Sequence, residues 1–161
     1  FQAMRELILL RHAHAAPARP GQSDLDRPLS PDGQAEAEAA AKWLANQRLV
    51  PDCVLCSPAR RTRETLEAVL SVLGYVDQRL EERIYEATPG TLIGLVEAGS
   101  DADRLLVVGH NPGLERLVAL LSSGQSSQFR GMPPAGIAVL EFADGVPLEP
   151  GAAALSAFWC P

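Results

Sequence analysis

The stretch Arg104-Leu-Leu-Val-Val-Gly-His-Asn-Pro112 contains the strongest strand signal of the chain and is the best guide to its fold. Its apolar residues follow one another without the alternation of a half-exposed strand, which is typical of a central parallel strand covered on both faces. His110 comes directly after this run. Ligands of open parallel sheets bind beyond the carboxyl ends of the strands, so His110 is predicted to lie at a binding edge.

Two further apolar runs end in basic residues in the same way. Glu6-Leu-Ile-Leu-Leu10 is followed by Arg11-His12. Asp52-Cys-Val-Leu-Cys56 is followed by Ser57-Pro-Ala-Arg-Arg61. The carboxyl ends of parallel strands meet at one edge of a sheet, so these histidines and arginines are expected to form a small cationic pocket. A pocket of this kind suits a phosphoryl group.

Strand and helix signals alternate along the chain, which predicts an α/β fold. We expect a three-layer α/β/α sandwich with a mostly parallel central sheet and an antiparallel edge strand. A weaker extended stretch covers about residues 77–85, and two final strands cover about 137–142 and 154–159. These last two strands are expected to be antiparallel neighbours at one edge of the sheet.

Three short patterns predict where helices begin. Ser30-Pro31, Ser57-Pro58 and Thr88-Pro89 each place a residue that caps helix N-termini before a proline that suits the first helical position. The helices are expected to reach about residues 47, 73 and 98. A fourth helix is expected from Asn111-Pro112 to about residue 121, followed by a polar loop from Ser122 to Gln128.

The composition is that of an ordinary globular protein with an acidic charge balance. The 161 residues are 47% hydrophobic and 21% charged, with a formal net charge of -6. We expect one domain spanning residues 1–161, and no nucleic-acid or membrane partner. No apolar run approaches the roughly 18 residues of a membrane span, and the first residues do not resemble a secretory signal. A cytoplasmic location is expected, with Met4 as the natural start and Phe1–Ala3 as a remnant of expression.

Cys53 and Cys56 form a C-x-x-C pattern that could indicate zinc binding or redox chemistry. They lie within a predicted strand, however, where residues three apart point to opposite faces. A pair in this geometry cannot readily bind one metal ion or close a disulfide. We interpret both residues as buried thiols.

His12 is the candidate nucleophile, because a neutral imidazole attacks phosphorus well. Nearby cations such as Arg11 and Arg61 should lower the pKa of His12 from its usual value of about 6.5. The same cations would stabilise the oxygens of a phosphoryl group in the transition state. The alternative is a histidine that only caps the end of a strand.

The basic start of the second predicted helix leaves a choice open. A helix N-terminus favours anions, and an arginine can bind two phosphate oxygens at once. Arg60 and Arg61 are about 100° apart on a helix, so they should not both face the pocket. Spacing alone does not choose between them. His110 could bind phosphate, position His12, or simply be satisfied by loop carbonyls.

Three ordered motifs together resemble the histidine phosphatase (phosphoglycerate-mutase-like) superfamily. They are Leu9-Leu-Arg-His-Ala-His-Ala15, Ser57-Pro-Ala-Arg-Arg-Thr-Arg-Glu-Thr65 and Val107-Val-Gly-His-Asn-Pro112. The short chain and the stretch Asp26-Arg-Pro-Leu-Ser-Pro-Asp-Gly33 are similar to the compact SixA-type phosphohistidine phosphatases. The similarity extends over nearly the whole chain.

The resemblance implies a metal-independent phosphatase that uses no cofactor. It also implies that His12 is phosphorylated transiently, that the motif arginine is Arg61, and that the second family histidine is His110. Arg11, Arg61 and His110 would hold the phosphoryl oxygens. Arg27 matches a further arginine that the SixA-type branch places near the phosphate.

Two positions depart from the family pattern. Ala13 stands where the family usually has glycine after the first Arg-His pair. The acidic proton donor of larger members has only Glu86 as its nearest match, in a poorly matching context, so Glu86 is a candidate general acid or a surface residue. A phosphohistidine substrate needs little help from an acid, because its leaving imidazole takes a proton near neutral pH. His14 is expected to contact substrate at the rim of the pocket.

The short chain leaves little room for a cap over the pocket, and an open pocket suits a phosphorylated side chain on another protein. The expected partner is therefore a phosphohistidine protein. The alternative substrate is a small phosphomonoester such as a sugar or nucleotide phosphate. The alternative function is a phosphate-binding module without turnover. The sequence leaves the oligomeric state open.

Overall fold

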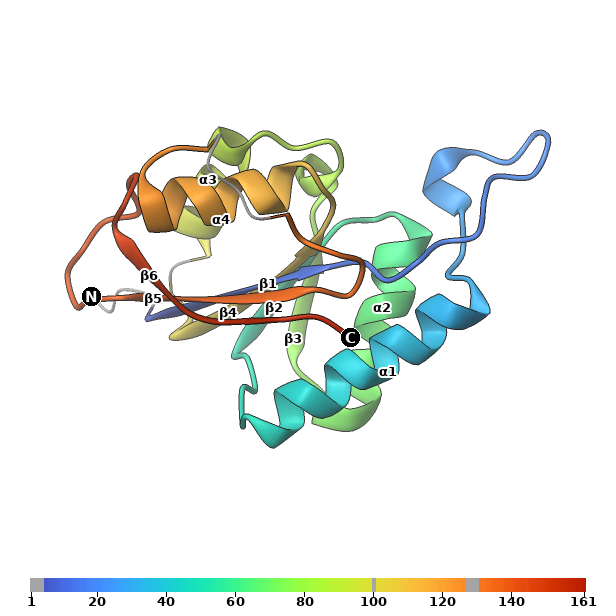
Figure 1. Ribbon diagram of the computed structural model, residues 1–161, viewed down its shortest axis with the longest axis horizontal. Helices are drawn as coiled ribbons and strands as arrows, with labels where there is room; N and C mark the ends of the chain where they lie inside the picture. Colours follow the sequence, from blue (N-terminus) through green and yellow to red (C-terminus); the bar gives the residue numbers. More distant parts are fainter. Residues whose placement is uncertain (1–4, 100, 127–130) are drawn as a thin grey trace.

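The computed structural model describes residues 5–99, 101–126 and 131–161 and is built around one six-stranded sheet (Figure 1). The strands are β1 (Glu6–Arg11), β2 (Cys53–Cys56), β3 (Asp77–Leu80), β4 (Arg104–Gly109), β5 (Ile137–Phe142) and β6 (Ala153–Trp159). The helices are α1 (Pro31–Asn46), α2 (Arg60–Leu73), α3 (Pro89–Ala98) and α4 (Gly113–Ser123), with short 3-10 turns η1 (Asp24–Asp26) and η2 (Glu82–Ile84).

The strands lie in the order β3-β2-β4-β1-β5-β6 across the sheet. The first four are parallel neighbours, whereas β5 pairs antiparallel with β1 and β6 pairs antiparallel with β5. The prediction of a mostly parallel sheet with antiparallel pairing at one edge is thus confirmed. β4 lies inside the sheet and is buried from Leu105 to Gly109, as its unbroken apolar run predicted.

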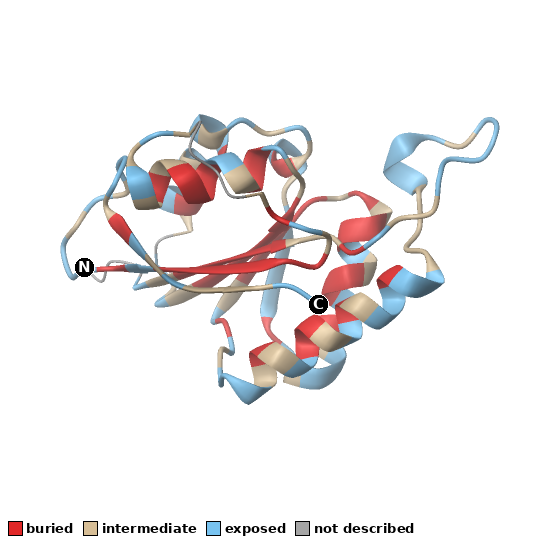
Figure 2. Cartoon of the chain, in the orientation of Figure 1, coloured by how far each residue is buried: buried red, intermediate tan, exposed pale blue. Residues whose placement is uncertain are grey.

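Helices cover both faces of the sheet, which confirms the three-layer α/β/α sandwich. In Figure 1, α1 and α2 lie on one face and α3 and α4 on the other. Figure 2 shows the central strands as buried between these layers. Alternate residues of the strands separate into two cores, with Leu105 packed toward α3 and α4 and Leu106 toward α1 and α2. Cys53 and Cys56 are free thiols that contact opposite cores, as predicted, but only Cys56 is buried and Cys53 is half-buried.

Two of the three predicted helix caps are confirmed. The hydroxyls of Ser30 and Thr88 each accept a hydrogen bond from the backbone N–H three residues later, at the starts of α1 and α3. The third prediction is wrong, because α2 begins only at Arg60 and has no side-chain cap. Ser57 is fully buried, and its hydroxyl bonds to His110 instead.

The loop predicted from Ser122 to Gln128 begins too early, because α4 continues to Ser123. Residues 127 and 128 of that stretch lie outside the described part, as do residues 1–4. Trp43 of α1 stacks on Trp159 of β6 with ring centroids 5.6 Å apart. None of the helices in the described ranges is long and apolar enough to span a lipid bilayer.

Candidate active site

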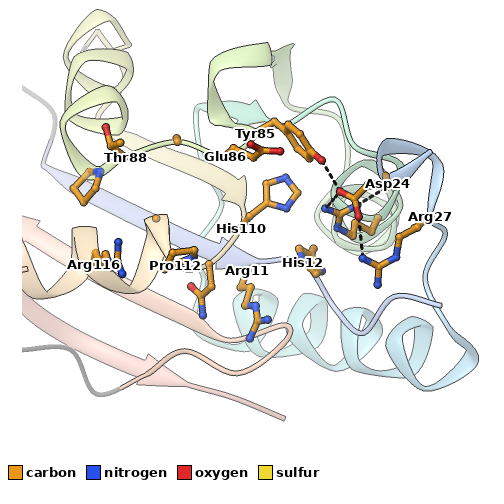
Figure 3. A pocket seen from close by; sticks show the side chains of 15 residues that line it. Arg11, His12, Asp24, Arg27, Tyr85, Glu86, Thr88, His110, Pro112 and Arg116 are labelled. Atoms are coloured by element: carbon orange, nitrogen blue, oxygen red, sulfur yellow. Dashed lines mark hydrogen bonds and ion pairs between the residues drawn. The ribbon is translucent and has the colours of Figure 1, made fainter. Parts of the chain in front are cut away.

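A pocket of about 520 Å³ opens where β1, β2 and β4 reach their carboxyl ends (Figure 3). This is the position at which open parallel sheets bind ligands. The strand-end argument therefore located the pocket from the sequence. The lining includes six of the candidate residues named above, namely Arg11, His12, Arg27, Arg61, Glu86 and His110.

Arg11 is the last residue of β1 and lines the pocket from the sheet itself. Its Nη1 donates a hydrogen bond of 2.8 Å to the carbonyl oxygen of Met132. Its Nε is buried and has no acceptor among the described residues. Buried donors are normally paired, and the Nε of Arg104 is the other exception in the described part of the chain.

His12 follows β1 and is held by the backbone on both sides. Its N–H donates to the carbonyl oxygen of Gly109 at 3.1 Å, and its own carbonyl accepts from the N–H of Ala135 at 3.1 Å. The ring nitrogen Nδ1 lies 2.7 Å from the carbonyl oxygen of Ala13. Because a carbonyl oxygen can only accept, Nδ1 carries the proton. Nε2 is therefore the nitrogen with a free lone pair.

The pKa of His12 is lowered from its usual value of 6.5 to about 4. Burial is the largest cause because it penalises the charged imidazolium, and the charges of Arg61, Arg11 and Arg27 lower the pKa further. The sequence predicted the direction of this change but credited it to the cations rather than to burial. His12 is uncharged at neutral pH.

His110 follows β4 and lies opposite His12, with the two ring centroids 5.2 Å apart. Its Nε2 lies 2.8 Å from the hydroxyl oxygen of Ser57, which orients the ring. Burial, followed by the nearby His12 and Arg61, lowers the pKa of His110 to about 3. Since both imidazoles are neutral, the positive charge of the pocket comes from its arginines.

Arg61 lies in the first turn of α2 and is almost fully buried, whereas Arg60 turns outward to surface carboxylates. The structure thus agrees with the choice that the family resemblance made and spacing left open. Thr65 connects this turn to the histidine segment, because its hydroxyl donates to the carbonyl of Arg61 at 2.8 Å and accepts from the N–H of Ala13 at 3.1 Å. One buried hydroxyl therefore fixes Arg61 relative to His12.

Asp24 is a pocket residue that sequence reasoning missed. Its carboxylate accepts hydrogen bonds from Arg61 at 3.0 Å, from Arg27 at 3.1 Å and from the hydroxyl of Tyr85. These donors, Tyr85 first, hold the pKa of Asp24 well below its usual range. The spacing of Asp24 and Arg27, three residues apart in a polar loop, was the available signal. The reach of Asp24 to Arg61 did not follow from it.

Glu86 lines the pocket and adopts a left-handed backbone conformation with φ of 56°. This conformation is costly for a residue other than glycine, and such residues cluster at binding sites. Tyr85, Asn111 and Arg116 also line the pocket and were not predicted. His14 does not belong to the lining, and its Nδ1 lies 2.6 Å from a carboxylate oxygen of Glu36.

Two glycines allow close approaches that shape the pocket wall. A Cβ on Gly113 would lie 2.7 Å from the carbonyl oxygen of Ala87, so α4 can meet the segment before α3 only at a residue without a side chain. A Cβ on Gly33 would clash with the carbonyl oxygen of His14. That contact seats α1 against the segment that follows His12.

Comparison with known proteins identifies relatives over most of the chain. The family model of the histidine phosphatase superfamily (branch 1) matches residues 7–102. An uncharacterized protein of Mycobacterium tuberculosis is 39% identical over 160 residues, which cover 92% of this chain and 98% of that protein. The phosphohistidine phosphatase SixA of Escherichia coli is 34% identical over 127 residues, which cover 75% of this chain and 76% of SixA.

Solved structures agree with these sequence matches. A crystal structure assigned to SixA of Agrobacterium tumefaciens superimposes on this chain with a TM-score of 0.87 at 32% identity. The superposition covers 98% of this chain and 99% of that chain. The similarity therefore includes the sheet, its covering helices and the strand ends that form the pocket.

Proposed function

This chain belongs to the histidine phosphatase superfamily and has a SixA-like fold, and from that premise we propose that it removes the phosphoryl group from phosphohistidine on another protein. Members of the superfamily are hydrolytic phosphatases, so the substrate and the covalent route are what the proposal adds. One observation carries it: a neutral His12 with a free Nε2 shares a pocket with Arg11, Arg61 and His110.

In the first step, the lone pair on Nε2 of His12 forms a bond to phosphorus in line with the leaving imidazole. The N–P bond of the substrate breaks, and its electron pair stays on the substrate nitrogen. The substrate ring takes a proton at its other nitrogen near neutral pH and leaves as neutral imidazole, so it needs no acid from the enzyme. The proton on Nδ1 of His12 remains in its hydrogen bond to the Ala13 carbonyl.

The arginines stabilise the charge that spreads over the phosphoryl oxygens in the transition state. Arg11 and Arg61 are held by protein hydrogen bonds before substrate arrives, so little reorganisation is needed during the reaction. Arg27 adds a third guanidinium to the same lining. His110 stays neutral, so it contributes a hydrogen bond rather than a charge.

In the second step, water attacks the phosphorus on His12. The O–P bond forms as the N–P bond breaks, and the electron pair returns to Nε2. One water proton stays on the phosphate and the other passes to solvent, so the product is hydrogen phosphate. Dividing one displacement into two steps lowers the barrier of each. This scheme uses no metal ion and no cofactor.

Rapid quenching with a radiolabelled phosphohistidine protein tests the covalent route. We expect an acid-labile, base-stable label on the wild-type protein and none on His12→Ala. His14→Ala removes a histidine outside the pocket lining and should retain the label. Turnover by the wild type without any labelled intermediate would contradict the route.

A small phosphomonoester is the second candidate substrate, and the position of Glu86 favours it. An alkoxide leaving group needs a proton, and Glu86 is a carboxyl in the pocket lining that could supply one. Efficient hydrolysis of small esters together with inert phosphohistidine proteins would establish this substrate. Glu86→Gln should then lower kcat for esters by about 10²–10⁴-fold. Phosphate binding without turnover of either class would indicate a binding module.

A further inference from the structure

The pocket is larger than one phosphoryl group requires. Its volume of about 520 Å³ lies among sites that enclose a whole small molecule, roughly 300–1,000 Å³. Figure 3 shows that it extends to both sides of the two histidines, with Asp24 and Arg27 toward one end and Thr88 and Arg116 toward the other. We call the second end, lined by Thr88, Pro112 and Arg116, the Arg116 arm.

The two ends differ in how their arginines are satisfied. Arg27 and Arg61 both donate to the carboxylate of Asp24. Arg116 is exposed, and its side chain forms no hydrogen bond or ion pair within residues 5–99, 101–126 and 131–161. The adjacent Glu115 is engaged by the side chain of Asn111 instead. The Arg116 arm therefore presents a guanidinium whose donors are open to a ligand.

The other groups of the Arg116 arm do not neutralise the positive charge of Arg116. The hydroxyl of Thr88 is used at the start of α3, where it accepts from the N–H of Thr91. Glu86 lies toward Tyr85, whose pKa is raised by Asp24 first and by the charge of Glu86 as well. A negatively charged group in the arm would meet Arg116 without displacing a carboxylate that the structure pairs with it.

We propose that the Arg116 arm binds a second negatively charged group of the substrate, a carboxylate close to the phosphohistidine. The inference rests on the proposed function, because it assigns the space between His12 and His110 to the phosphoryl group. The planar fork of arginine matches the two oxygens of a carboxylate. A protein substrate with Asp or Glu near its phosphohistidine occupies both parts of the pocket, whereas a neutral neighbour leaves Arg116 unpaired.

Nonhydrolysable phosphonates separate this proposal from the phosphatase reaction. One series joins a phosphonate to a terminal carboxylate through a varied number of methylene groups, and the matched series ends in methyl. For the best length, the carboxylate should tighten binding to the wild-type protein by up to about fivefold, the upper range for an exposed ion pair. Titration calorimetry measures the ratio of the two dissociation constants.

Three variants test whether Arg116 is the residue responsible for that ratio. In Arg116→Gln the ratio should fall to about one, and Arg116→Lys should restore part of it. Arg79→Gln removes an equal charge from an exposed residue of β3 outside the pocket lining and should keep the wild-type ratio. A wild-type ratio near one, a ratio that survives in Arg116→Gln, or an equal fall in Arg79→Gln would each overturn the proposal.

Peptide turnover then extends the result to the substrate. Phosphohistidine peptides with Glu or Gln beside the phosphorylated residue should differ in kcat/KM with the wild type and not with Arg116→Gln. Equal values with the wild type would overturn the preference for an acidic neighbour. If no peptide is hydrolysed at all, the proposed function fails, while the phosphonate ratio still decides whether the Arg116 arm binds a carboxylate.

Discussion

The two ends of the same central strands carry similar side chains and pair them differently. At the amino ends of β1 and β4, Arg104 donates to Glu6 at 2.8 Å, and its backbone N–H donates to Asp52 at 3.0 Å. At the carboxyl ends, Arg11 donates to a backbone carbonyl, and the adjacent His12 is kept neutral. Each end has a pocket, of about 470 Å³ at the amino end and about 520 Å³ at the carboxyl end. Size therefore does not tell them apart.

The balance of charge does distinguish the two ends. The lining at the amino end contains two arginines and four carboxylates, whereas the lining at the carboxyl end contains four arginines and two carboxylates. In a chain with a net charge of -6, only the second arrangement opposes the overall field. An anion is thus attracted locally to the carboxyl end. Paired charges support the fold at one end, and excess charge is available for a ligand at the other.

The largest effect is expected from His12→Ala. Loss of the proposed nucleophile should lower kcat by at least about 10⁴-fold, the scale seen when one member of a catalytic unit is removed. Arg104→Gln removes a charge at the opposite end of the sheet and should leave kcat unchanged. Initial rates with one phosphohistidine substrate measure both variants. A large loss in Arg104→Gln would show that the two ends are not separate in function.

Arg61→Gln should follow in size. Removing a fixed donor to the transition state lowers kcat/KM by about 10²–10³-fold. Arg60→Gln is the matched control, since Arg60 is the adjacent residue and lies outside the pocket lining. Steady-state kinetics on both variants test the assignment. Similar losses would mean that a diffuse basic face matters and not the arginine inside the pocket.

Acid should lower the free energy of unfolding through His12, which lies at the carboxyl end of the sheet. The pKa of His12 is about 4 in the folded protein and 6.5 without the fold, so between these values the unfolded chain binds a proton that the folded chain excludes. The contribution of the neutral ring to stability is complete above about pH 6.5 and is lost as the pH falls toward 4, on the order of 3 kcal/mol.

Urea unfolding at pH 7 and pH 4.5 measures this loss in the wild type and in His12→Gln. The wild type should lose more of its free energy of unfolding than the variant. Turnover should also persist below pH 6, because His12 remains unprotonated there. Equal acid sensitivity of the two proteins would contradict the low pKa.

These expectations depend on features that the sequence revealed unequally. Arg11, His12 and His110 follow apolar runs, and a parallel sheet brings such positions to one edge whatever the loops do. The choice between Arg60 and Arg61 was different, because the phase of a helix depends on where it begins. Ser57 serves His110 rather than capping α2, so that beginning was predicted too early.

Other pocket residues were missed because no periodic pattern in the local sequence indicates that they face the pocket. Asp24 begins the 3-10 turn η1 and Tyr85 follows η2, and their contact depends on how the segments after β1 and β3 pack together. Arg116 lies on a helix, but the segment before α3 determines that it faces a pocket. For the same reason the sequence did not predict burial as the main cause of the low pKa of His12, since the burial of a side chain depends on the complete fold.

A smaller effect within the carboxyl end is expected from Asp24→Asn. The carboxylate of Asp24 takes hydrogen bonds from Arg61 and Arg27 and opposes the charge of an arriving phosphoryl group. Its neutralisation should tighten inhibition by inorganic phosphate by about fivefold, the scale of a partly exposed charge pair. The inhibition constant of phosphate measures the change. Weaker inhibition would show that Asp24 mainly orients the arginines.

The smallest effect is expected at the amino end, from Glu6→Gln. Arg104 and Glu6 are 29% and 22% exposed, and Arg104 keeps the carbonyl oxygen of Val50 as an acceptor at 3.2 Å. The free energy of unfolding should therefore fall by only about 1 kcal/mol, with no change in kcat or KM. Urea unfolding and initial rates test this. A changed KM with unchanged stability would mean that the acidic end shapes the field that guides substrate, and charge pairing would then no longer separate a structural end from a functional one.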